Sequence, residues 1–180
     1  MTSTSDLNAL RRRILETAYH AGEGHIPSAL SILEIVATLY DKVLGVTPEN
    51  WQEPGANQFV LSKGHGCLAL YAVLEAHGFI TTEDMDQFCQ PGGLLGGHPG
   101  PGIPGVWAAT GSLGHGLGMA VGMAYAKKLR GEAGRYLCTG PLFPRSHTRI
   151  VGDSRNSFVL YSPTVQTRLS AQGVENLTFS

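Results

Sequence analysis

The stretch that decides the fold class is Phe59-Val60-Leu61-Ser62-Lys63-Gly64-His65-Gly66, which continues into an apolar segment from Cys67 to His77. Residues 59–62 predict a short buried strand, because they begin with aromatic and branched apolar side chains. Gly64 breaks that strand, and the apolar segment predicts a helix. A strand, a glycine turn and a helix in this order are typical of a parallel α/β unit, in which ligands bind beyond the carboxyl ends of the strands. The sequence therefore predicts an α/β fold with a ligand site beside residues 62–66.

Helices are expected before this strand. Asp6 is a suitable N-cap for a helix that ends near His20. Its buried face would carry Leu7, Leu10, Ile14, Leu15 and Ala18. Gly22-Glu23-Gly24 ends this helix, and Pro27 suits the first turn of a second helix, whose apolar stripe continues to about Leu44.

A long loop and one more helix are expected after the strand. Thr81-Thr82-Glu83-Asp84 predicts the capped start of a short helix. Residues 91–111 form a loop rich in Gly and Pro, and loops of this length in compact domains are often functional. A helix begins near Ser112, and its glycines recur every four residues on one face: Gly114, Gly118 and Gly122. We expect this face to admit another backbone closely, in the core or at a subunit contact.

Composition excludes several classes of protein and divides the chain in two. The 180 residues carry a net charge of −1, which argues against a dedicated nucleic-acid binder, and the 42% of hydrophobic residues argue against global disorder. Residues 1–132 hold 8 basic and 12 acidic side chains, whereas residues 133–180 hold 5 and 2. The second segment is dense in Ser, Thr, Arg and Pro and lacks a long apolar period. We therefore expect a domain over residues 1–132 and a divergent tail over residues 133–180, whose composition favours disorder.

Cysteine usage and hydropathy indicate a cytoplasmic, non-membrane protein. Cys67, Cys89 and Cys138 are odd in number and lack the spacing of a metal site, which suits a reducing compartment. Residues 87–126 contain no charged side chain, but histidines, prolines and glycines interrupt the stretch. A membrane-spanning helix needs about 20 apolar residues, so insertion is not expected.

Four histidines with glycine neighbours are the candidate reactive groups: His25, His65, His98 and His115. Small neighbours expose an imidazole, which can donate to phosphate oxygens and move protons near neutral pH. Several such residues with few carboxylates nearby suit an anionic, oxygen-rich ligand. Zinc is the alternative ligand, but the sequence contains no His-x3-His or Cys-x2-Cys pair.

The turn Gly111-Ser112-Leu113-Gly114 leads into the last expected helix and could hold an anion through its backbone N–H groups and the helix end. It is neither a Walker loop nor a dinucleotide fingerprint, because the required residues and spacing are missing. Lys63 could add a positive charge or be solvated. A simple binder of phosphate ligands, using this helix end alone, is therefore one alternative function.

Three motifs taken together resemble those of transketolases. They are, in chain order, residues 22–31 (GEGHIPSALS), residues 59–66 (FVLSKGHG), and a third motif distributed over residues 96–99, 104–106 and 110–117. Their order and spacing agree over about residues 7–132. The resemblance is to the amino-terminal, thiamine-diphosphate-binding part, similar to the amino-terminal subunit of two-subunit transketolases.

This resemblance implies a truncated thiamine-diphosphate-binding α/β fold, helix-rich with a short parallel sheet. It also implies a transferase that moves a two-carbon ketol unit between sugar phosphates. By position, the cofactor-binding residues would be His65, Gly111, Ser112, Leu113 and His115. His25 and His98 would face the substrate as catalytic residues. The family binds its diphosphate with Mg²⁺.

The magnesium motif of the family is missing from this sequence. A strand is expected near residues 135–138, and Thr139-Gly140-Pro141 follows it where the family has Gly-Asp-Gly. Asp153 and Asn156 resemble that magnesium motif weakly, but they lie further along the chain. A turn explains these two residues better. The resemblance also implies a partner, either a carboxy-terminal transketolase subunit or a second copy, that supplies the pyrimidine-binding domain. The alternative is a non-catalytic module that pairs with a transketolase subunit.

Overall fold

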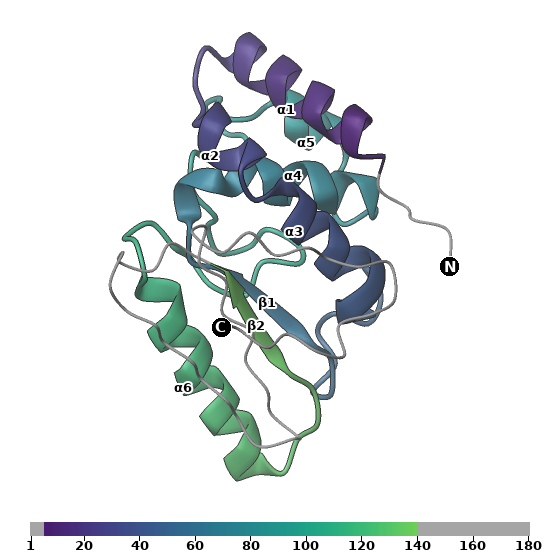
Figure 1. The fold of residues 1–180 in the computed structure, drawn as a ribbon, viewed down its shortest axis with the longest axis vertical. Coiled ribbons are helices and arrows are strands. Elements are labelled where there is room, and N and C mark those ends of the chain that lie inside the picture. Colours follow the sequence, from purple (N-terminus) through teal and green to yellow (C-terminus); the bar gives the residue numbers. More distant parts are fainter. Residues whose placement is uncertain (1–5, 140–180) are drawn as a thin grey trace, which may run out of the picture.

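The computed structural model describes residues 6–139, in which most helices gather at one end of a short sheet and α6 lies along the sheet (Figure 1). The elements, in order, are α1 (Leu7–Ala21), α2 (Ile26–Leu30), α3 (Leu33–Thr38), a π-helix (Leu39–Leu44), β1 (Gln58–Leu61), a 3₁₀ turn (Gly64–Gly66), α4 (Cys67–Ala76), α5 (Thr82–Asp86), α6 (His115–Arg130) and β2 (Tyr136–Thr139). The strands are parallel, with Gln58 opposite Tyr136 and Leu61 opposite Thr139. The predicted strand–turn–helix unit is therefore present, and the strand expected near residues 135–138 is β2, one residue further on.

Helix α1 forms as the sequence predicts, with one difference on its buried face. The Asp6 carboxylate accepts hydrogen bonds from the N–H groups of Asn8 and Ala9, and Gly22 ends the helix with φ of +66°. Leu15, however, is 46% exposed, so the buried face of α1 is narrower than the sequence predicts.

The single helix expected from Pro27 to Leu44 is instead three pieces, and a side chain from another segment of the chain contacts the first break. In a continuous α-helix the Ile32 N–H would donate to the Ser28 carbonyl. Here it donates to the Ala29 carbonyl, while the Ser28 carbonyl accepts from the Lys63 ammonium at 3.2 Å and from the Ser31 hydroxyl at 2.9 Å. A side chain from the turn after β1 thus takes the place of the helical N–H.

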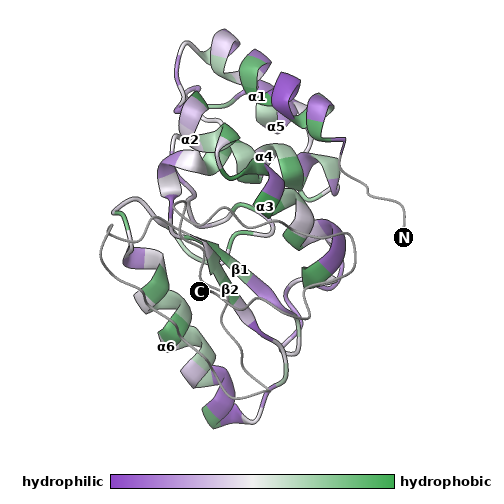
Figure 2. Ribbon diagram, in the orientation of Figure 1, coloured by the Kyte–Doolittle hydropathy of each residue, from purple (hydrophilic) through white to green (hydrophobic). Residues whose placement is uncertain are grey.

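The main core surrounds α4, whose residues from Cys67 to Leu74 are all buried. Figure 2 shows this helix as mostly hydrophobic, in contrast to the mixed surface of α1. Arg13 joins α1 to two other helices, because its guanidinium bonds Glu75 of α4 at 2.8 Å and Asp86 of α5 at 2.9 Å. Thr81 and Asp84 form the expected capping box at the start of α5.

Helix α6 begins at His115 and packs on the strands through Ala120 and Ala124. Gly114, Gly118 and Gly122 make no close approach within residues 6–139, because a Cβ built on any of them would have no described atom within 4 Å. The expected contact in the core is therefore absent from this part of the chain, and a subunit contact stays a prediction. Gly116 makes the close contact instead, since a Cβ there would lie 2.7 Å from the Ser62 Cβ.

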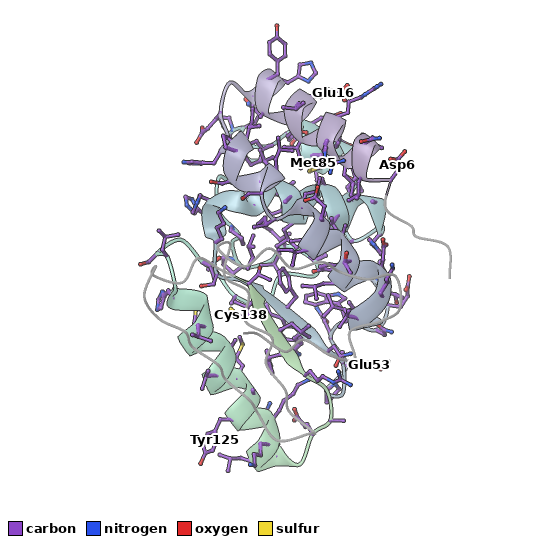
Figure 3. The ribbon with its side chains drawn as sticks, viewed as in Figure 1. Asp6, Glu16, Glu53, Met85, Tyr125 and Cys138 are labelled. Atoms are coloured by element: carbon purple, nitrogen blue, oxygen red, sulfur yellow. The ribbon has the colours of Figure 1, made fainter. Side chains whose placement is uncertain are left out.

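The outer face of α6 is apolar as well as glycine-rich. Tyr125, labelled in Figure 3, points away from the strands and is 62% exposed. Leu129 on the same helix is 70% exposed, and Val121 is 39% exposed. None of the described helices is long and apolar enough to span a bilayer. Asp153, Asn156 and the rest of the expected tail beyond residue 139 lie outside the described residues.

Candidate functional site

Two glycine turns lie against each other at the carboxyl end of the sheet. The Thr110 hydroxyl donates to the Leu61 carbonyl at 2.6 Å, and both residues are buried. A Cβ on Gly64 would collide with the Thr110 carbonyl, so only glycine permits this approach of the two backbones. The turn after β1 and the turn before α6 are thereby fixed side by side.

Three of the four candidate histidines converge at these turns. The ring centroids of His25 and His65 are 5.6 Å apart, and those of His25 and His98 are 6.4 Å apart. His25 precedes α2, His65 lies in the 3₁₀ turn after β1, and His98 lies in the long loop. His65 is half-buried, whereas His25 and His98 are exposed. The three rings therefore form one cluster with a solvent-facing side.

Helix α4 holds the loop that carries His98. The Tyr71 hydroxyl lies 3.1 Å from the Gly96 carbonyl and 3.0 Å from the His98 carbonyl, and the Cys67 thiol donates to the Gly97 carbonyl at 3.1 Å. Burial raises the pKa of the Cys67 thiol to about 12, so the thiol keeps the proton that it donates. We did not predict these supporting residues, although a tyrosine inside an apolar helix requires a partner for its hydroxyl.

The environment of His65 favours a neutral imidazole. Its pKa is lowered from the usual value, first by burial and then by electrostatic interaction with Lys63, His25 and His98. A neutral imidazole at neutral pH can either donate or accept a proton.

The free amides of the glycine turn at residues 111–114 lie before α6 and not within the helix. In the first turn of α6, the N–H groups of His115, Gly116 and Leu117 already donate to Ser112, Ser62 and Gly114. By contrast, within the described residues the N–H groups of Gly111, Ser112 and Leu113 make no hydrogen bond, and all three residues are exposed. The sequence predicts anion binding by the turn and the helix end together, and the geometry favours the turn.

Gly111 belongs to the histidine cluster, and His115 does not join it through ring contacts. A Cβ on Gly111 would lie 3.7 Å from the His98 ring, so the amide turn adjoins the three rings. His115 is exposed, and none of the ring contacts among the described residues includes it.

A separate cavity of about 230 Å³ lies at the other end of the strands, where Gln58, Lys127 and Tyr136 contribute to its lining. None of the clustered histidines lines it. Over residues 6–139, no group of three or more His, Cys, Asp or Glu side chains could hold a metal ion.

Residues 2–148 match the family described as transketolase, thiamine diphosphate binding domain. The chain belongs to this family. Among its relatives, an apulose-4-phosphate transketolase subunit from Phocaeicola vulgatus is 44% identical over 119 residues, which are 66% of this chain and 42% of that protein. The 6-deoxy-6-sulfo-D-fructose transketolase subunit SqwG of a Clostridium species is 40% identical, over 68% of this chain and 45% of that protein.

Solved transketolases share the fold of this transketolase-family chain. One from Pichia stipitis, in complex with fructose 6-phosphate, has a TM-score of 0.66 and 27% identity over 73% of this chain and 21% of its own. One from Leishmania mexicana has a TM-score of 0.64 and 28% identity, over 73% of this chain and 22% of its own. The resemblance and fold class inferred from the sequence are therefore confirmed. The chain spans less than half the length of the curated relatives described above.

Proposed function

We propose that this chain contributes the diphosphate-binding side of a transketolase active site. The observation that carries the proposal is the convergence of His25, His65 and His98 on the turn at Gly111. Exposed, unpaired backbone N–H groups are suitable donors to diphosphate oxygens, and a half-buried imidazole beside them adds a further donor. The residues of this cluster therefore fit the anionic end of thiamine diphosphate.

The proposed roles combine the half-buried position of His65 and the free amides of the turn with the resemblance to transketolases. His65 and the amides of Gly111, Ser112 and Leu113 would hold the cofactor, while His25 and His98 face solvent and would bind hydroxyls or move protons on a sugar phosphate. We keep His115 as a proposed cofactor contact on the sequence resemblance alone. When bound, thiamine diphosphate supplies the ylide and the electron sink for transfer of a two-carbon ketol unit. Magnesium is a family expectation for which residues 6–139 offer no ligand group, and no step is assigned to it.

The proposal includes a partner and a compartment. Two relatives are named as transketolase subunits, and this chain matches less than half of each. We propose that a carboxy-terminal transketolase subunit, or a second copy in a homo-oligomer, completes the site, and that the assembly acts on sugar phosphates. The three cysteines without metal spacing favour the cytoplasm.

Isothermal titration of the full chain with thiamine diphosphate, with and without Mg²⁺, tests the cofactor proposal. We expect saturable heat that is lost in His65→Gln and retained in His20→Gln, because His20 is exposed on α1, outside the cluster. Inorganic pyrophosphate is the second ligand. Equal binding of pyrophosphate and thiamine diphosphate would favour the simple phosphate binder, and absence of heat at about millimolar cofactor would contradict the proposal.

A non-catalytic pairing module is the second candidate, favoured by the exposed apolar face of α6. Tyr125 and Leu129 are mostly exposed, and a Cβ on Gly118 or Gly122 would have no atom of residues 6–139 within 4 Å. Size-exclusion chromatography with a carboxy-terminal transketolase subunit tests this role. Co-elution that is lost in Leu129→Glu, together with no cofactor heat for the complex, would favour the module over the enzyme.

A further inference from the structure

Lys63 makes contacts that the cofactor proposal does not use. Its side chain is half-buried, and its ammonium donates to the Ser31 hydroxyl at 2.7 Å and to the Ser28 carbonyl at 3.2 Å. These two acceptors lie at the end of α2, whereas Lys63 lies between β1 and the 3₁₀ turn. The lysine therefore connects two segments about thirty positions apart in the sequence.

Each of the connected segments carries one ring of the histidine cluster. His25 immediately precedes α2, a helix of only five residues, and His65 is two residues after Lys63. A five-residue helix has little stability of its own, so its position depends on tertiary contacts. The contact of Gly66 with the Ile32 side chain supports the same junction, because a Cβ on Gly66 would lie 2.7 Å from Ile32 Cδ1.

We propose that Lys63 is a positioning residue that clamps the end of α2 to the turn after β1 and so fixes the His25 ring against the His65 ring. Because the Ser28 carbonyl accepts from Lys63, the chain leaves the α-helix at Ser31 instead of continuing it. The break sets where α2 ends and α3 begins. Lys63 thus acts on the site through His25 and His65 and need not touch a ligand.

The charge of Lys63 has a second effect on the same pair. Burial contributes most to the lowered pKa of His65, followed by electrostatic interactions with Lys63, His25 and His98, all of which act in the same direction. Removal of the Lys63 charge should therefore raise the pKa of His65. The meaning of the clamp for catalysis rests on the proposed function, whereas the clamp itself can be tested on the chain without cofactor.

NMR of the full chain without cofactor separates the geometric effect from the electrostatic effect. In Lys63→Met we expect the nuclear Overhauser contact between the His25 and His65 rings to be lost and the pKa of His65 to rise. Lys63→Arg should restore both, because it keeps a donor and a charge. Ser31→Ala should weaken the ring contact but leave the pKa of His65 lowered, since the lysine charge remains. Lys42→Met, at an exposed lysine on the π-helix, is the matched control and should change neither.

An unchanged ring contact in Lys63→Met would overturn the clamp, even if the pKa of His65 rises. If Lys63→Met does not fold, Ser31→Ala decides, and a wild-type ring contact in that variant overturns the proposal. Failure of thiamine diphosphate to bind would remove the proposed function without affecting either NMR result.

Discussion

Two glycines on one helix have opposite surroundings. Gly116 faces the sheet, where its N–H donates to the Ser62 hydroxyl at 3.0 Å and a Cβ would lie 2.7 Å from the Ser62 Cβ. Gly118, further along the same helix, has no described atom within 4 Å of the place where its Cβ would lie. Gly116 therefore tests a tight contact of α6, and Gly118 on the same helix is the control.

Gly116→Ala should destabilise the chain, whereas Gly118→Ala should stabilise it. The added methyl group at Gly116 forces Ser62 and α6 apart, for which we expect a loss of about 1–3 kcal/mol in the free energy of unfolding. At Gly118 the same change only removes the backbone flexibility of glycine, for a gain of about 0.5–1 kcal/mol. Urea denaturation of both variants measures the difference, and equal effects would contradict the packing described for α6.

His65 should make stability depend on pH. Its pKa is lower in the folded chain than in the unfolded chain, so the unfolded chain takes up the proton first as the pH falls. Its contribution to stability is therefore neutral above the unfolded pKa of about 6.5 and becomes increasingly unfavourable as the pH falls from there towards the folded pKa. The loss of stability between pH 7 and pH 5 should be smaller in His65→Gln than in the wild type, as measured by urea denaturation. An identical loss would show that His65 does not titrate abnormally.

At the scale of elements, α4 supports the loop that carries His98. Cys67 and Tyr71 are four residues apart and hence lie on the same face of the helix, and together they bind the carbonyls of three successive loop residues. The loop from residue 91 to residue 111 contains no helix or strand, so these bonds replace regular secondary structure.

Tyr71→Phe should therefore destabilise the chain more than its small size change suggests. The substitution removes one hydroxyl and leaves the carbonyls of Gly96 and His98 without this donor, for an expected loss of about 1–3 kcal/mol. Tyr125→Phe is the control, because Tyr125 is exposed on α6, and its effect should stay within about 0.5 kcal/mol. Thermal unfolding compares the two, and similar melting temperatures would argue against the support by α4.

At the scale of the whole molecule, one guanidinium joins three helices. Arg13 of α1 bonds Glu75 of α4, Asp86 of α5 and the Thr82 carbonyl. Arg13→Met should lower the free energy of unfolding by about 2 kcal/mol. The substitution removes charged hydrogen bonds and leaves the carboxylate of Glu75 partly buried without this partner. Arg12→Met changes the neighbouring, exposed arginine and should have little effect. If denaturant midpoints of the two variants coincide, Arg13 does not hold the helices together.

Much of this architecture could be predicted because it depends on local signals. The strand, the glycine turn and the helix over residues 59–77 follow from neighbouring residues, as do the Asp6 cap and the Thr81 capping box. The histidines of the cluster, His25, His65 and His98, could be singled out because each has a glycine neighbour.

The features that could not be predicted depend on contacts between distant residues. The break after α2 requires a lysine from another segment, and the spacing of glycines on α6 does not say which of them faces the sheet. The support of His98 by Tyr71 likewise joins residues 27 positions apart. The roles of the site residues and the domain boundary near residue 132 remain predictions.

The pairing of the two strands has a consequence for how the chain acquires its structure. Gln58 of β1 pairs with Tyr136 of β2, so the first strand must wait for a partner synthesised 78 residues later. Contacts of this separation close slowly, because the intervening chain loses entropy before the contact is made. On the ribosome, α1 to α5 would emerge and collapse first. The sheet would be completed late, which leaves the backbone N–H and C=O groups of β1 unpaired during synthesis and open to chaperones.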